Sequence, residues 1–500
     1  MDYISSRDTI VSVKASQAII QGIAPDGGLF VPEEFPQMDL EAVLETAKKG
    51  YTALAAYIAA PYLDEFSEEE VQDIAANAYD AGFEHADKAP VMRLQDGQYV
   101  LELWHGPTLA FKDMALQMLP HLMSASRRKI GEQARILILV ATSGDTGKAA
   151  LEGFAGVEGI SIAVFYPHNG VSRAQELQMV THVGDNVFVG AVRGNFDDTQ
   201  TAIKRVFGNA GYAEELAGRG FRLSSANSIN WGRLLPQIVY YFWAYACLVR
   251  DRAVSTGGPV NFVVPTGNFG NILAGYYAKR MGLPVNKLIC ASNANNVLTD
   301  FFTSGGYDAT RPFYKTISPS MDILISSNLE RLLFEIAHRD GARVRDWMAT
   351  LRSKGAYQVA QEYMEEASAL FAAGCCDDAQ TKETIRNVFE SRGYLMDPHT
   401  AVAKRVLDDY MDSAKDFAPS VLVSTASPFK FSADVLSALG DVQADADEFE
   451  LAARLGGISG MKVPDAILKL QDMPIRFKEV LDAGAIEARM LAWAQMQSKG

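Results

Sequence analysis

Residues 136–147 read ILILVATSGDTG, and this stretch decides the fold class. Its first six residues are a short, continuous apolar run, which is typical of a β-strand covered on both faces. The next six residues bring glycines and hydroxyl side chains, and a helix is predicted from Lys148 onward. A buried strand, a glycine-containing turn and a helix make up the repeating unit of a parallel α/β sheet.

The same unit recurs on both sides of this stretch. Apolar, strand-like runs are predicted at residues 99–103, 160–166, 187–192, 260–264, 288–291 and 421–426. Segments with helical periodicity are predicted at residues 115–128, 197–209, 238–250 and 272–281. Strands that alternate with helices in this way indicate an α/β protein with parallel sheets.

A chain of 500 residues is too long for one simple core, so we expect several units. Residues 1–90 are predicted to form an N-terminal unit of helices and irregular segments. Residues 91–129 and 226–500 are predicted to form a large domain, with a helical block at 328–373. Residues 130–225 are predicted to form a small α/β domain.

The net charge of −15 argues against nucleic acid or an anionic membrane as a partner, because both would repel an acidic surface. Cys247, Cys290, Cys375 and Cys376 lack metal-binding spacing, so we expect no metal site and a reducing compartment. The N-terminus lacks the pattern of a signal peptide, and no apolar run reaches the ~20 residues that span a bilayer. We therefore expect a cytoplasmic protein, and we expect it to be a monomer or a homodimer.

Residues 101–117, LELWHGPTLAFKDMALQ, place Lys112 in an apolar segment. Removing an ammonium group from water costs free energy and lowers its pKa toward neutrality. A lysine in that state is a nucleophile that forms Schiff bases. The alternative is a lysine at the edge of a core helix whose amine reaches solvent, and this segment alone favours that alternative.

Two loops follow buried strands and open helices, which places both at the carboxyl edge of a sheet, where ligands bind. They are residues 143–147 (SGDTG) and 266–271 (TGNFGN). Helix N-termini attract anions, and glycines let the backbone approach a ligand closely. The second loop is neither a Walker A loop nor a GxGxxG loop, so it predicts a phosphate or carboxylate site rather than a dinucleotide site. The alternative for each loop is an ordinary glycine turn.

Two further segments carry hydrogen-bonding groups. Residues 227–233 (NSINWGR) offer amide, hydroxyl and guanidinium groups to an anion, although a helix cap beside a surface arginine is the simpler explanation. Residues 424–428 bring a hydroxyl to the same sheet edge. A phosphate cradle, a desolvated lysine and a hydroxyl together suggest pyridoxal phosphate, without selecting it over other lysine chemistry.

Across nearly its whole length the chain resembles the threonine synthases of the long bacterial and fungal form. The stretches that carry the resemblance are YISSR at 3–7, APDGGLFVP at 24–32, HGPTLAFKD at 105–113, TSGDTG at 142–147, NSINWGR at 227–233, TGNFGN at 266–271 and DPHTAV at 397–402. This family belongs to the fold-type II pyridoxal phosphate enzymes, like tryptophan synthase β. The resemblance implies an α/β protein with two parallel α/β domains and an N-terminal helical unit.

The resemblance also implies roles for individual residues. Lys112 would be the catalytic Schiff-base lysine, and Thr425 would meet the pyridine nitrogen of the cofactor. The other implied cofactor ligands are Gly267, Asn268, Phe269, Gly270, Asn271 and, near the cofactor O3′, Asp145. The implied substrate ligands are Thr108, Ser143, Gly144, Thr146, Gly147, Ser228, Asn230 and Arg233. The chain departs from the expected pattern at Ser427, where we expect histidine, and many fold-type II relatives carry asparagine in place of Asp145.

The implied reaction converts O-phospho-L-homoserine and water to L-threonine and phosphate, with pyridoxal 5′-phosphate as cofactor. Lys112 would hold the cofactor first, and after displacement by substrate its amine would move protons at Cα and Cβ. Two alternatives stay open: a phospho-lyase on the same scaffold that releases a 2-keto acid, and a non-catalytic amino-acid- or nucleotide-binding protein. A dehydrogenase fits less well, because no GxGxxG with a downstream acidic residue is present.

Overall fold

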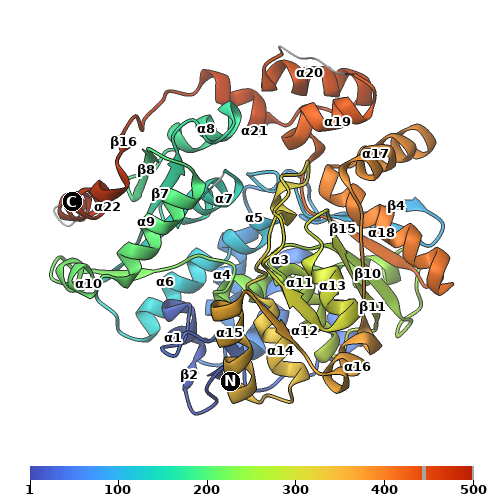
Figure 1. Ribbon diagram of the computed structural model, residues 1–500, viewed down its shortest axis with the longest axis horizontal. Helices are drawn as coiled ribbons and strands as arrows, with labels where there is room; N and C mark the ends of the chain where they lie inside the picture. Colours follow the sequence, from blue (N-terminus) through green and yellow to red (C-terminus); the bar gives the residue numbers. More distant parts are fainter. Residues whose placement is uncertain (143, 442–445, 498–500) are drawn as a thin grey trace.

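The computed structural model describes residues 1–142, 144–441 and 446–497, and its main feature is a pair of parallel sheets (Figure 1). The larger sheet has six strands in the order β14-β11-β10-β15-β5-β4. In that order they are Phe371–Cys375, Val285–Ser292, Val260–Pro265, Ser420–Ser424, Gln98–Glu102 and Val91–Gln95. Neighbouring strands are parallel except β4, which runs antiparallel to β5.

The smaller sheet has five parallel strands in the order β16-β8-β7-β6-β9. In that order they are Val480–Leu481, Val187–Val192, Ile160–Pro167, Arg135–Ala141 and Phe221–Ser224. The run ILILVA forms β6, and residues 136–140 are buried, which confirms the predicted two-sided cover. The helices of this region are α7 (Asp145–Phe154), α8 (Arg173–Val180), α9 (Phe196–Gly208) and α10 (Ala210–Ala217).

The N-terminal unit contains a small sheet that was not predicted. Strand β1 (Asp2–Ser5) pairs antiparallel with both β2 (Ser12–Lys14) and β3 (Phe30–Pro32). These strands are three or four residues long, too short for their apolar pattern to be read from the sequence. The helices here are α1 (Ala15–Gln21), α2 (Leu40–Ala47), α3 (Tyr51–Ala59), η1 (Ala60–Tyr62) and α4 (Glu68–Tyr79).

The helix predicted at residues 115–128 is two helices, α5 (Lys112–Leu116) and α6 (Leu119–Lys129). Pro120 lies in the first turn of α6, where its missing N–H does no harm, so it starts a new helix there. The predicted helix at 238–250 is the second half of α11 (Trp231–Arg250), whose residues 231–248 are all buried. Helix α11 packs against α3, α5 and α12 (Gly270–Arg280) at the centre of the large domain.

The remaining helices lie around the six-stranded sheet and along the C-terminal part of the chain. They are α13 (Val297–Ser304), η2 (Pro319–Met321), α14 (Leu329–Ile336), α15 (Gly341–Lys354), α16 (Gln361–Leu370), α17 (Asp378–Arg392), α18 (Pro398–Ala414), η3 (Pro428–Phe431), α19 (Ser432–Ala438), α20 (Glu448–Ser459), α21 (Asp465–Leu468) and η4 (Lys469–Asp472). The block predicted as helical at 328–373 also contains β13 (Ala356–Gln358), which pairs with β12 (Gly306–Asp308), and the start of β14.

The C-terminal boundary of the predicted large domain needs a correction. Residues 226–500 were assigned to that domain, but β16 pairs with β8 and therefore extends the smaller sheet. Helix α22 (Ile486–Gln497), after η5 (Ala483–Ala485), buries Met490 and Trp493 in the same core as residues of β6, β7 and β8. Figure 1 shows the C-terminus beside β8 and far from β10. Two residues of strand are too short a signal to be read from the sequence.

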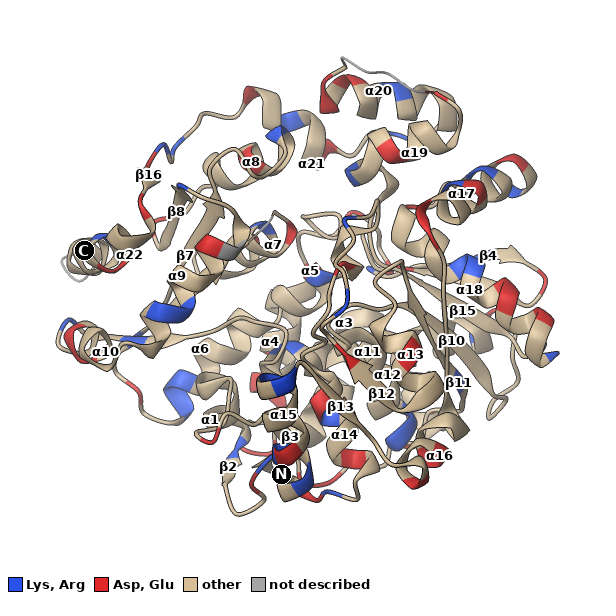
Figure 2. Ribbon diagram, viewed as in Figure 1, with Lys and Arg blue, Asp and Glu red and all other residues tan. Residues whose placement is uncertain are grey.

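Along the ribbon, acidic and basic residues lie interspersed on the outer helices, and the strands of the sheets are mostly uncharged (Figure 2). Within the described part of the chain, no helix combines the length and apolar character needed to cross a membrane.

Candidate active site

Lys112 lies at the carboxyl edge of the six-stranded sheet, where hydrogen bonds hold its loop to the end of β15. The Phe111 N–H donates to the Thr425 carbonyl (2.8 Å), and the Ser427 N–H donates to the Leu109 carbonyl (3.0 Å). Leu109 has a left-handed backbone (φ 60°), which turns the chain so that α5 begins at Lys112. The Thr425 hydroxyl makes no hydrogen bond within the described residues. Lys112 and Thr425 therefore share one sheet edge, as predicted.

The Lys112 amine is buried among charged groups of both signs. Its side chain is 13% exposed, and its Nζ lies 3.7 Å from Asp145 Oδ2. Burial lowers the pKa of this amine; the Asp145 carboxylate acts in the opposite direction, and Lys430 and Arg233 add to the lowering. The side chain is therefore largely withdrawn from solvent, and a lowered pKa gives the amine the environment of a nucleophile.

Thr108 shapes the Lys112 loop, and its polar groups already have protein partners. Its N–H and hydroxyl donate to the two carboxyl oxygens of Asp113 (2.8 and 2.6 Å), and its carbonyl accepts from Lys430 Nζ (3.0 Å). Burial raises the pKa of Asp113 to about 6. A Cβ at Gly106 would overlap with the Asp113 side chain, so this turn requires glycine. These contacts give Thr108 a structural role, and its assignment as a substrate ligand stays a prediction.

The loop between β10 and α12 presents a row of free backbone donors. The N–H groups of residues 267–271 make no hydrogen bond within the described part of the chain. The carbonyls of the same loop are held from outside: Ser326 Oγ donates to the Gly267 carbonyl (2.7 Å), and the Asn328 N–H and Nδ2 donate to the Asn268 carbonyl (3.1 and 3.0 Å). Free N–H groups at a helix N-terminus form an anion site.

The Asn271 side chain adds one more unused donor to this loop. Its Oδ1 accepts from the hydroxyls of Tyr240 (2.7 Å) and Tyr241 (2.9 Å), and its buried Nδ2 has no partner within the described residues. The two tyrosines therefore fix which way the amide points. Phe269 is left-handed (φ 64°) with a buried ring, so it contributes only its backbone to the loop.

A phosphate group fits this cradle. A Cβ at Gly267 would overlap with the Ser320 carbonyl oxygen, so only glycine permits the close wall on that side. The Ser320 N–H in turn donates to His399 Nε2 (3.1 Å), and His399 Nδ1 lies 2.8 Å from Asp397 Oδ1. The free N–H groups and the orphaned amide match the several acceptor oxygens of a phosphate.

The loop between β6 and α7 is built differently. The N–H groups of Gly144 and Gly147 both donate to Thr142 Oγ1 (3.0 and 2.9 Å), so one hydroxyl shapes the turn. The N–H groups of residues 145–146 have no acceptor within the described part of the chain and open the first turn of α7. The predicted substrate ligand Ser143 lies outside the described residues.

Asn230 is a helix cap. Its Oδ1 accepts from the Gly232 N–H (2.9 Å), and its Nδ2 donates to the carbonyls of Ile19 (2.9 Å) and Ser225 (3.1 Å). Both amide hydrogens are therefore used, and the side chain is fully buried. The prediction of Asn230 as a substrate ligand is corrected to an N-cap of α11, the alternative that the sequence had left open.

Arg233, unlike Asn230, has hydrogen-bond donors that no described residue uses. Its guanidinium is buried, and its only hydrogen bond within the described residues goes from an Nη to the Ala226 carbonyl (2.9 Å). Burial lowers the pKa of Arg233 to about 10. A buried guanidinium without a carboxylate partner is a strong ligand for an anion. Ser228 lies nearby on the same loop, 3.4 Å from the Ser327 hydroxyl.

Two buried lysines of the site were not predicted. Lys430 Nζ lies 2.9 Å from Asp145 Oδ1, and Lys148 Nζ donates weakly to the Pro107 carbonyl (3.4 Å). Burial, with Lys430 nearby, lowers the pKa of Lys148 to about 8. Lys430 stands between two phenylalanines, the same apolar-flanked pattern that singled out Lys112, so the sequence did carry a signal for it.

Arg331 links this site to the N-terminal unit. Its guanidinium donates to the carbonyl of Phe30 in β3 (2.9 Å), to Asn328 Oδ1 (2.6 Å) and to the Ile229 carbonyl (2.7 Å). Asn328 holds the cradle and Ile229 belongs to the loop of Arg233, so one buried side chain positions both anion-binding segments. The N-terminal unit is therefore part of the support of the site.

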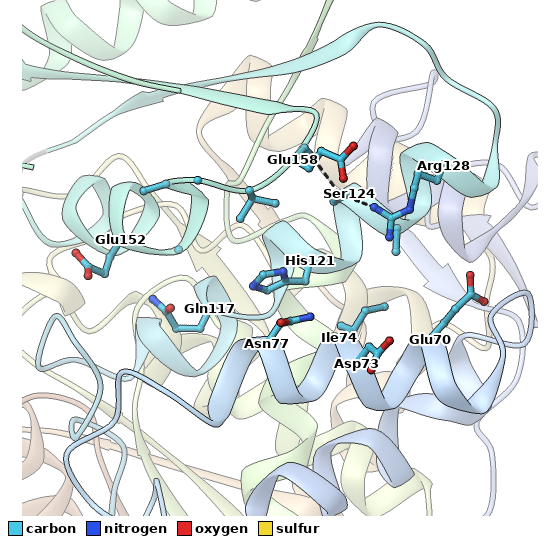
Figure 3. A pocket seen from close by; sticks show the side chains of 15 residues that line it. Glu70, Asp73, Ile74, Asn77, Gln117, His121, Ser124, Arg128, Glu152 and Glu158 are labelled. Atoms are coloured by element: carbon cyan, nitrogen blue, oxygen red, sulfur yellow. Dashed lines mark hydrogen bonds between the residues drawn. The ribbon is translucent and has the colours of Figure 1, made fainter. Parts of the chain in front are cut away.

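A separate polar pocket of about 490 Å³ lies between α4, α6 and α7 (Figure 3). Gln117, His121 and Glu152 line it. It lies at the carboxyl end of α7, whereas Asp145 lies at the amino end. None of the predicted site residues lines this pocket, so it is distinct from the Lys112 site.

Comparison with known protein families gives two matches. Residues 2–79 match the family described as "Threonine synthase N terminus", and residues 89–376 match the family described as "Pyridoxal-phosphate dependent enzyme". The chain is 41% identical over 435 residues to a threonine synthase of Pseudomonas aeruginosa, covering 86% of this chain and 89% of the relative. It is 41% identical to human threonine synthase-like 1, but it spans only 58% of that protein's length.

Solved structures agree with the sequence comparisons. A crystal structure of pyridoxal-phosphate-bound threonine synthase from Brucella melitensis matches with a TM-score of 0.89 at 36% identity, over 99% of this chain and 100% of that chain. The yeast threonine synthase structure matches with a TM-score of 0.88 at 33% identity, over 99% of both chains. The predicted fold-type II architecture is thereby confirmed.

Proposed function

The chain belongs to the threonine synthase family of pyridoxal-phosphate-dependent enzymes, and on that premise we propose that it converts O-phospho-L-homoserine and water to L-threonine and phosphate. The observation that carries the proposal is a cradle of N–H groups, without partners among the described residues, on the same sheet edge as Lys112, whose side chain is only 13% exposed. Strands β10, β15 and β5 are consecutive neighbours in the sheet, and their carboxyl ends bring the cradle, Thr425 and Lys112 to one place.

The residues present suit pyridoxal 5′-phosphate. The N–H groups of residues 267–271 and the Asn271 amide would hold its phosphate, and the Lys112 amine would hold its aldehyde carbon. The unbonded Thr425 hydroxyl would meet the pyridine nitrogen, and Asp145 would lie near the phenolic oxygen. When bound, the cofactor supplies an electron sink for negative charge developing on the substrate carbons.

Substrate binding is assigned to the cationic and N–H groups around the cofactor. Arg233 and Ser228 would bind the substrate phosphate, and the free N–H groups of residues 145–146, at the start of α7, would bind its carboxylate. The freed Lys112 amine would take the proton from Cα and return protons during loss of phosphate from Cγ and addition of water at Cβ. Burial lowers the pKa of this amine and so favours the neutral form that accepts a proton.

The test uses the purified full-length protein. We expect a visible absorption band at about 410–430 nm from cofactor held by a lysine, and the Lys112→Ala variant should lack it and lose at least about 1,000-fold in activity. With O-phospho-L-homoserine the products should be threonine and phosphate. Release of 2-oxobutanoate and ammonia without threonine would show a phospho-lyase instead. Absence of any such band would leave a non-catalytic binding protein.

We further propose that the enzyme acts in the cytoplasm, as a monomer or a homodimer, on this small-molecule substrate alone. The support is the similarity to threonine synthases, together with the acidic and basic residues that are interspersed along the outer helices. Light scattering of the purified chain distinguishes the two assembly states. An obligate higher oligomer would contradict the proposal.

A further inference from the structure

Lys430 is a second lysine at the active site, and it competes with Lys112 for one carboxylate. It lies in η3, directly after the strand end that carries Thr425, and its side chain is only 6% exposed. Its Nζ lies 2.9 Å from Asp145 Oδ1, and Lys112 Nζ lies 3.7 Å from Asp145 Oδ2. The carboxylate therefore stands between two ammonium groups and is closer to Lys430.

A carboxylate beside an amine favours the protonated amine, and an ammonium cannot attack an aldehyde. If Asp145 faced Lys112 alone, it would hold Lys112 in the charged form. In addition, a neutral Lys112 would leave the Asp145 carboxylate as a largely buried charge without a partner, which is strongly unfavourable. A second cation removes both obstacles, because it keeps Asp145 paired whatever the charge of Lys112.

We propose that Lys430 is a positioning residue that occupies the Asp145 carboxylate and so leaves Lys112 free to lose its proton and react with an aldehyde. The inference rests on the proposed role of Lys112 as the amine that holds pyridoxal phosphate. Lys430 also fixes the geometry, because its Nζ donates to the Thr108 carbonyl in the Lys112 loop. It thereby joins that loop to the first turn of α7.

The charged groups that face Lys112 support the proposal that Lys430 favours the neutral form of its amine. They come from Asp145 on α7, Lys430 on η3 and Arg233 on α11. Burial lowers the pKa of the Lys112 amine most; Asp145 raises it, and Lys430 and then Arg233 lower it further. Asp145 itself stays ionised, because Lys430 and Lys112 outweigh the effect of burial and hold its pKa below the usual value.

The experiment measures how fast the full-length enzyme, stripped of cofactor, takes up pyridoxal 5′-phosphate between pH 6 and 10, as growth of the visible band. The rate should follow the unprotonated fraction of Lys112. In Lys430→Met the midpoint of this profile should move to higher pH, with uptake at pH 7 at least about tenfold slower. Asp145→Asn should move the midpoint to lower pH. The double variant should return to within about threefold of the wild-type rate, because each change cancels the other.

Two controls separate charge from structure. Lys430→Arg keeps the cation and should keep the wild-type midpoint within about 0.5 pH, whereas a purely steric role of the lysine stem would not distinguish arginine from methionine in this way. Pyridoxal without its phosphate, used as a second aldehyde, should give the same order of midpoints, because it does not depend on the cradle. If Lys430→Met does not fold, the arginine, asparagine and double variants still decide the proposal.

Several results would overturn the inference. An unchanged midpoint in a folded Lys430→Met protein would show that Lys430 does not act on Lys112. A double variant as slow as Lys430→Met would show that it does not act through Asp145. These outcomes differ from failure of the proposed function, which would appear as absence of a Lys112-dependent visible band or as release of 2-oxobutanoate without threonine.

Discussion

Two loops of this molecule have the same place in the fold and opposite construction. Residues 266–271 follow β10 and open α12, and residues 142–147 follow β6 and open α7. Distant side chains hold the first loop: Ser326 and Asn328 bind its carbonyls, and Tyr240 and Tyr241 fix Asn271. The second loop rests on its own Thr142 hydroxyl, and its links to the large domain are ion pairs of Asp145.

Because the two loops are held differently, we expect the first to control cofactor affinity and the second to control the response of the site to pH. Buried hydrogen bonds fix the first loop before any ligand arrives, so its donors are already aimed, and a change there should alter cofactor affinity. Charge links the second loop to Lys112, so a change there should alter how the site responds to pH. Three predictions test this comparison, beginning with the largest expected effect.

Asn271→Asp should weaken binding of pyridoxal 5′-phosphate by at least about 100-fold, because it replaces an unpaired, buried side-chain donor of the cradle with a negative charge that faces a phosphate. Asn271→Ala removes the donor without adding charge and should weaken binding by only about tenfold. Both are measured by titration of the stripped enzyme, with the melting temperature as a check of folding. Equal effects of the two variants would contradict this view of the first loop, because the charge at residue 271 would then not affect binding of the phosphate.

Most of the fold could be predicted from the sequence, because its strands are long enough to carry a pattern. β6, β7, β10 and β15 are buried on both faces and read as apolar runs. What could not be predicted depends on tertiary contacts. Strand β16 is two residues long and exists because it pairs with β8. The break between α5 and α6 did have a local cause, Pro120, which the helical pattern concealed.

The residues of the site also fall into those that the sequence could predict and those that depend on tertiary contacts. Lys112 and the glycines of the cradle could be predicted from local sequence. Lys112 lies in an apolar segment, and the glycines lie in a loop between a buried strand and a helix. Asn230 and Arg233 stand three residues apart, and only the structure shows that one caps a helix while the other is unpaired. Arg331 could not be predicted, because its role depends on meeting the carbonyls of Phe30 and Ile229, which come from distant segments.

Thr142 and Thr266 are each the first residue after a strand, and replacing each one tests whether its hydroxyl stabilises the loop that follows. Thr142→Val should lower the free energy of unfolding by about 2 kcal/mol, because two buried N–H groups lose their acceptor. Thr266→Val, at the same place after β10, removes only a donor to the Val264 carbonyl (2.7 Å) and should cost about 0.5–1 kcal/mol. The measurement is the shift of the urea unfolding midpoint of each variant. Equal shifts would contradict the view that the second loop depends on its own hydroxyl.

The smallest effect is expected at Ser427, which is hydrogen-bonded to the Lys112 loop and where histidine was expected. Its hydroxyl has one long hydrogen bond within the described residues, accepted from the Phe429 N–H (3.4 Å). Its link to the Lys112 loop is the backbone N–H that donates to the Leu109 carbonyl, which any residue except proline can supply. Ser427→Ala should therefore change kcat/KM by less than about threefold and stability by less than about 1 kcal/mol. A tenfold or greater loss of kcat/KM, with an unchanged melting temperature, would mean that this hydroxyl contacts the ligand. The segment after β15 would then act on the site through Ser427 as well as through the charge of Lys430.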